Sequence, residues 1–142
     1  SMSLSRIEGR VLAIDYGERR IGLALSDELG IIASGIGTLN SDDTAATRIA
    51  ALAVERGAAR IIVGLPLTLS GERGSAVVMV EKFVAQLREL VTVQVELFDE
   101  RFTSSLAQQA IRDMGVGKKK RRDKGKVDEI AAIILLQGYL DR

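Results

Sequence analysis

Apolar residues recur along this chain with two different periods. Short runs that are apolar throughout, or that alternate with polar residues, are typical of β-strands, and they occupy residues 10–15, 20–26, 31–38, 60–64 and 91–98. Apolar residues at helical spacing predict helices over residues 45–56, 76–87, 103–114 and 128–140. The expected order is therefore β-β-β-α-β-α-β-α-α.

Polar residues and glycines mark the ends of these elements. Gly17 and Gly30 lie between predicted strands, where we expect turns with a positive φ. The polar cluster at residues 40–43 predicts the start of the first helix, and Gly57 predicts its end.

This order predicts an α/β fold. Three strands in an antiparallel meander, followed by two βα crossovers, give a five-stranded mixed sheet flanked by helices. Residues 10–142 should form one domain, and residues 1–9 are a tag remnant or an N-terminal extension. The first, fourth and fifth strands should run parallel, so that their carboxyl ends share the sheet edge where ligands bind in open α/β folds.

Three acidic residues are expected at that edge. Asp15 closes the first strand, Glu100 follows the fifth, and Asp128 opens the last helix. Carboxylates that gather in this way suit two Mg²⁺ or Mn²⁺ ions, roughly 3.5–4 Å apart, that hydrolyse phosphodiester bonds. Taken singly, each acid has an ordinary alternative as a turn residue, a surface acid or a helix-start residue. Asp99 and Glu129 are neighbours that the pattern does not exclude from the site.

The composition restricts the chemistry. The chain has neither cysteine nor histidine, so disulfides, thiol nucleophiles, thiolate zinc sites and a histidine general base are excluded. Carboxylates with a hard divalent ion remain available. The sequence also lacks an eighteen-residue apolar run and a secretory signal, so we expect no membrane span and a cytoplasmic location.

A basic segment at residues 118–126 carries a local charge of +6, while the whole chain carries +1 and the remainder therefore −5. Such a segment can be a solvated hairpin, or it can clamp nucleic-acid phosphates over an acidic centre. The predicted clamp consists of Lys118, Lys119, Lys120, Arg121, Arg122, Lys124 and Lys126.

Four motifs in the same order resemble those of the YqgF/RuvX family. They are residues 15–24 (DYGERRIGLA), residues 63–66 (VGLP) with Gly71 and Gly74, residues 99–104 (DERFTS) and residues 126–132 (KVDEIAA). The resemblance covers roughly residues 10 to 140. It implies an RNase H-like fold related to Holliday-junction resolvases, and a nuclease that matures the 5′ end of the pre-16S ribosomal RNA.

Carried over by position, Asp15, Glu100 and Asp128 resemble the family's metal-binding catalytic acids. The resemblance also implies phosphate-facing roles for Arg101, Thr103 and Ser104. The expected partner is an RNA precursor. The alternative is branched DNA, whose resolution would require a homodimer.

Two other functions stay open from the sequence. An Asp-x-Gly turn also occurs in ATP-dependent phosphotransferases of the actin and sugar-kinase type, although those clamp the nucleotide between two domains. A non-catalytic nucleic-acid-binding module is the other alternative.

Overall fold

The computed structural model describes residues 9–67, 73–100 and 124–142. Its centre is a five-stranded sheet with the strand order β3-β2-β1-β4-β5. The strands are β1 (Arg10–Tyr16), β2 (Arg20–Ser26), β3 (Ala33–Asn40), β4 (Ala58–Leu65) and β5 (Gln94–Asp99). The β1–β2 and β2–β3 pairs are antiparallel, and the β1–β4 and β4–β5 pairs are parallel. The predicted mixed sheet is confirmed.

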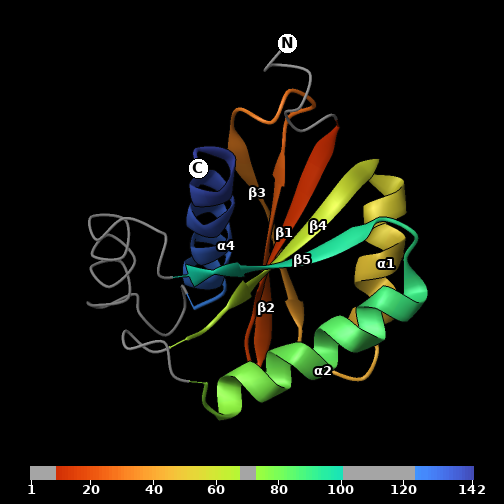
Figure 1. Cartoon of the computed structure of the whole chain (residues 1–142), viewed down its shortest axis with the longest axis vertical. Coiled ribbons are helices and arrows are strands. Elements are labelled where there is room, and N and C mark those ends of the chain that lie inside the picture. The colour runs from red at the N-terminus through yellow and green to blue at the C-terminus, as the bar shows by residue number, and fades with distance from the viewer. Residues whose placement is uncertain (1–8, 68–72, 101–123) are drawn as a thin grey trace.

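Helices cover both faces of the sheet (Figure 1). One face carries α1 (Ala45–Glu55) and α2 (Ser75–Leu90), and the opposite face carries α4 (Lys124–Leu140). The helix predicted over residues 103–114 lies outside the described residues, as does most of the basic segment. None of the described helices is long and apolar enough to cross a membrane.

Alternation along the strands divides the core in two. Leu12 and Ile14 of β1 belong to the cluster under α1 and α2, whereas Val11 and Ala13 belong to the cluster under α4. The same alternation continues to the ends of the strands. It therefore determines on which face each polar residue at the sheet edge lies.

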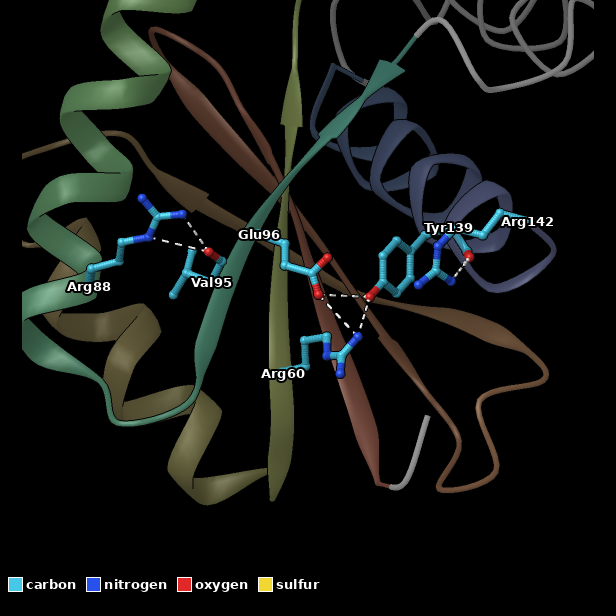
Figure 2. Close-up of polar contacts among 6 residues, drawn as sticks. All are labelled: Arg60, Arg88, Val95, Glu96, Tyr139 and Arg142. Carbon is cyan, nitrogen blue, oxygen red and sulfur yellow. Dashed lines mark hydrogen bonds and ion pairs between the residues drawn. The ribbon is translucent and has the colours of Figure 1, made fainter. Parts of the chain in front are cut away.

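The C-terminal end of α4 is anchored to β4 and β5 (Figure 2). Arg60 donates a hydrogen bond of 2.7 Å to the hydroxyl of Tyr139, and that hydroxyl donates one of 3.1 Å to Glu96. Arg60 and Glu96 also form an ion pair at 3.0 Å. The guanidinium of Arg142 lies 3.8 Å from the centre of the Tyr139 ring, on its other side from these partners. These contacts fix the position of the helix that carries Asp128.

Helix α4 begins earlier than predicted. The sequence placed its start near Asp128, but the described part of the helix already includes Lys124, so Asp128 lies at least one turn inside the helix and is no helix-start residue. Gly125 packs against β3, where an added Cβ would lie 3.5 Å from the Oγ1 of Thr38. The end of the basic segment is therefore part of a helix that lies against the sheet, which local charge did not reveal.

Two further details near the hairpins differ from expectation. The third strand was expected from residue 31, but Asp27 Oδ1 accepts the backbone N–H groups of Ile31 at 2.7 Å and Ile32 at 2.8 Å. That turn delays the strand to Ala33.

Gly30 has the expected positive φ of 71°, whereas Gly17 is not among the residues with positive φ. Gly17 is instead required by close packing, because a Cβ there would lie 2.7 Å from the carbonyl oxygen of Arg20.

Candidate active site

Asp15 lies near the carboxyl end of β1, the central strand of the sheet. Strand alternation places it on the same face as Val11 and Ala13, which is the face covered by α4. The carboxylate is thus presented toward the helix that carries Asp128.

Gly22 of β2 brings Asp128 next to Asp15. Gly22 is the direct partner of Asp15 in the antiparallel pair. A Cβ built on Gly22 would lie only 1.9 Å from the backbone oxygen of Asp128. Helix α4 therefore rests directly on β2 at this point, one strand away from Asp15, and no residue larger than glycine allows that approach.

Gly64 of β4 lies on the other side of Asp15, and it leaves room for Glu100 as Gly22 does for Asp128. Ile14 pairs with Val63 in the parallel register, so the next residues along, Asp15 and Gly64, lie side by side. A Cβ on Gly64 would lie 2.6 Å from the carboxylate oxygen Oε2 of Glu100. Asp15 thus has a glycine on each side, and another predicted site acid covers each glycine.

The charges of Glu100 and Asp128 both act on Asp15. Burial raises the pKa of Asp15 from 3.8 to about 7, with further contributions from the negative charges of Glu100 and Asp128. Burial also raises the pKa of Glu100, and the charge of Asp99 adds to that effect. The fold therefore places Asp15 and Glu100 where burial and neighbouring carboxylates make ionisation unfavourable. Carboxylates with such raised pKa values are common at functional sites.

Replacing Asp15 with asparagine should stabilise the metal-free protein at pH 8 by about 1–3 kcal/mol. Because the folded-state pKa is raised, the stability contributed by protonated Asp15 is fully present below about pH 4 and is lost as the pH rises through about 7. The asparagine variant does not lose it. Chemical denaturation at pH 4 and pH 8 measures the difference, with the exposed Asp43→Asn as control. Equal stabilities of Asp15→Asn and wild type at pH 8 would contradict this prediction.

Asp128 is held by a cation. The Nε of Arg20 donates to its Oδ2 at 2.6 Å, and the two side chains are 31% and 28% exposed. Within the described part of the chain, no three acidic side chains stand in an arrangement that could hold a metal ion as they are. The carboxylate donors and their backbone placement suit Mg²⁺ or Mn²⁺. Ion binding requires side chains to rotate, and the three-acid metal site stays a prediction.

Comparison with known proteins decides the family. A family model described as "RuvX: Holliday junction resolvase" matches residues 9–142. This chain belongs to the RuvX family. A Salinibacter ruber relative named "Putative pre-16S rRNA nuclease" is 44% identical over 142 residues, covering 99% of each chain. A Chloroflexus aurantiacus relative of the same name is 44% identical over 133 residues, covering 92% of this chain and 86% of the relative.

Solved structures agree on the fold of this RuvX chain. Thermus thermophilus RuvC in complex with a Holliday junction substrate has a TM-score of 0.57 at 13% identity, covering 94% of each chain. The fowlpox virus resolvase in its junction complex has a TM-score of 0.55 at 12% identity, covering 93% of this chain and 97% of that one. The RuvX chain has the RNase H-like fold of these resolvases, and its family makes nuclease chemistry on nucleic acid its reaction class.

The structure distinguishes Asp128 and Glu100 from their acidic neighbours in the RuvX chain. The Oε2 of Glu129 accepts the backbone N–H of Gly37 at 2.8 Å, and the absence of a side chain at Gly35 leaves room for its carboxylate. Glu129 thereby attaches α4 to β3. Asp99 ends β5 and, by alternation, shares the face of Val95 in the cluster under α1 and α2.

The predicted phosphate contacts are only partly described. Arg101, Thr103, Ser104 and residues 118–122 lie outside the described residues. Lys124 and Lys126 both belong to α4, and Lys126 is exposed two residues before Asp128.

Sequence reasoning did not assign a role in the site to Arg20 or Gly22 of the RuvX chain. A signal for both was present, because strand alternation from Ala24 places Gly22 and Arg20 on the face that α4 covers. The Gly64 loop was expected at the same sheet edge, but the position of Gly64 directly beside Asp15 follows only from the register of β1 against β4.

Proposed function

We propose that this RuvX chain is a divalent-metal-dependent nuclease in which Asp15, Glu100 and Asp128 hold the ions. Its proposed substrate is the precursor of 16S ribosomal RNA, cut at the 5′ end. One observation carries the proposal: Asp15 lies between Gly22 and Gly64, and these glycines admit Asp128 and Glu100 on either side.

The three acids have distinct surroundings, which suggests distinct tasks. Asp15 is the central acid and must lose its proton before it can bind a cation, since its pKa is about 7. Glu100 supplies a second carboxylate over Gly64, and Asp128 a third from α4. Divalent ions held by these carboxylates would supply activation of a water molecule and charge stabilisation at phosphorus. Lys126 and the basic residues before it hold the nucleic-acid strand near the acids in this proposal.

The names of the relatives support RNA as the substrate, since they are pre-16S rRNA nucleases by name. The family description favours a second candidate, resolution of Holliday junctions in branched DNA. That activity would need two copies of the chain, because two strands of one junction must be cut by two equivalent sites.

Cleavage assays separate these candidates. The protein is incubated with a labelled RNA spanning the 16S 5′ end or with a labelled four-way DNA junction, in Mn²⁺ or in EDTA. We expect the RNA to be cut in Mn²⁺ and not in EDTA. Symmetric cutting of the junction alone would favour resolvase activity, and cleavage of both substrates that persists in EDTA would contradict the proposal. Titration with ATP, which should show no binding, tests the phosphotransferase alternative.

Affinity for Mg²⁺ should rise about tenfold from pH 6 to pH 8 and become nearly constant above that. The reason is competition between the ion and one proton on Asp15, whose pKa is raised to about 7. Isothermal titration calorimetry at three pH values in this range measures the slope. Equal affinities at pH 6 and pH 8 would show that Asp15 does not bind the ion.

A further inference from the structure

The ion pair between Arg20 and Asp128 lies inside the proposed site. It joins the first residue of β2 to α4, residues far apart in the sequence. The guanidinium uses Nε, and the contact of 2.6 Å is that of a strong charge-assisted hydrogen bond. Asp128 Oδ2 is therefore bound by a cationic side chain of the protein itself.

Both ends of this pair are placed by the backbone. Arg20 pairs with Asn40 of β3, and the preceding turn packs so closely that a Cβ on Gly17 would lie 2.7 Å from the carbonyl oxygen of Arg20. On the other side, the backbone of Asp128 rests on Gly22. Since both backbones are held by close packing, the ion pair is set by the fold.

The charges explain why a cation is needed there. Glu100 and Asp128 approach Asp15 on one face of the sheet, over Gly64 and Gly22, and repulsion between Asp15 and these two carboxylates opposes folding when they are ionised. Arg20 offsets part of this repulsion by neutralising Asp128. The same contact has a cost for ion binding, because Arg20 must release Oδ2 before a divalent ion can use that oxygen.

We propose that Arg20 is a positioning residue that holds Asp128 in the metal-free protein and competes with divalent ions for its carboxylate. This inference rests on the proposed function, since it assumes that Asp128 is a metal ligand. It adds a role for Arg20: the residue sets the concentration of free Mg²⁺ or Mn²⁺ at which the site fills.

The decisive variant is Arg20→Gln, which keeps a hydrogen-bond donor and removes the charge. It should bind Mn²⁺ about threefold to tenfold more tightly than wild type in calorimetry at pH 8. If Arg20 only supported the fold, replacing it would weaken Mn²⁺ binding instead of tightening it. The thermal stabilisation produced by Mn²⁺ should likewise be larger in Arg20→Gln than in wild type.

Matched controls isolate the pair. Arg19→Gln removes the same charge from the exposed neighbouring residue and should bind Mn²⁺ as wild type does. Arg20→Lys retains the charge and should tighten Mn²⁺ binding less than Arg20→Gln does. Affinity in Arg20→Gln that is equal to wild type or weaker would overturn the proposal, as would equal tightening in all three variants.

The outcomes also separate this inference from the proposed function. If wild type binds Mn²⁺, Asp15→Asn does not, and Arg20→Gln shows no tightening, only the role of Arg20 fails. If wild type shows no Mn²⁺ binding that depends on Asp15, both the proposed metal site and the role of Arg20 fail. Should Arg20→Gln not fold, the Nε–H resonance of Arg20 in wild type serves instead. It should shift as Mg²⁺ is added, and an unchanged resonance at saturating Mg²⁺ would overturn the competition.

Discussion

Replacing Asp15 with asparagine should abolish divalent-ion binding and reduce phosphodiester cleavage by about a thousandfold or more. Asp15 is the central acid of the three, with Asp128 reaching it over Gly22 and Glu100 over Gly64. Asparagine has nearly the same shape but carries no charge, so the site would lose the group on which both neighbours converge. Calorimetry with Mn²⁺ and single-turnover cleavage of labelled RNA measure the two effects.

Nucleic-acid binding should be largely retained in the same variant, because the basic residues that are proposed to hold the strand are unchanged. Asp43→Asn, on the exposed surface before α1, is the matched control and should cleave as wild type does. Retained cleavage in Asp15→Asn would remove the proposed site. Since this variant is also expected to be more stable above pH 7, loss of activity could not be attributed to unfolding.

Replacing Gly22 with alanine should destabilise the protein by about 3 kcal/mol or more. The added methyl group would lie 1.9 Å from the backbone oxygen and 2.5 Å from the carbonyl carbon of Asp128. Backbone atoms of a packed helix cannot rotate away as a side chain can, so α4 would have to move off the sheet. Urea denaturation measures the loss, and Mn²⁺ affinity should fall with it because Asp128 moves as well.

Gly74→Ala is the matched control for this substitution. Gly74 has an ordinary φ of −108°, and a Cβ there would meet nothing within 4 Å. Its stability should stay within about 0.5 kcal/mol of wild type. A Gly22→Ala protein as stable as Gly74→Ala would show that α4 does not rest on β2 as described.

Local hydrophobic pattern was sufficient for most elements, and it failed where a contact from outside a segment acts on its first residues. The start of β3 moved because the side chain of Asp27 binds the backbone of Ile31 and Ile32. Helix α4 includes residues before Asp128, where Gly125 lies next to Thr38 of β3. In both cases the deciding contact lies outside the periodic pattern of the segment itself.

The choice among neighbouring acids shows the same limit. The sequence left Asp99 and Glu129 as alternatives to Glu100 and Asp128. Strand alternation assigns Asp99 to the other face, and the hydrogen bond from Gly37 gives Glu129 a structural role. Alternation was available from the sequence, but the partner of Glu129 was not, because Gly37 is 92 residues away along the chain.

By itself the sequence predicted the mixed sheet and the shared edge at which Asp15 and Glu100 lie. These follow from hydrophobic periodicity and from the direction of parallel crossovers, which are local properties of the chain. Only the tertiary structure decided how the acids meet. The two glycines that admit them and the arginine that holds Asp128 act across strands and helices, and such contacts depend on register and on close approach of backbones.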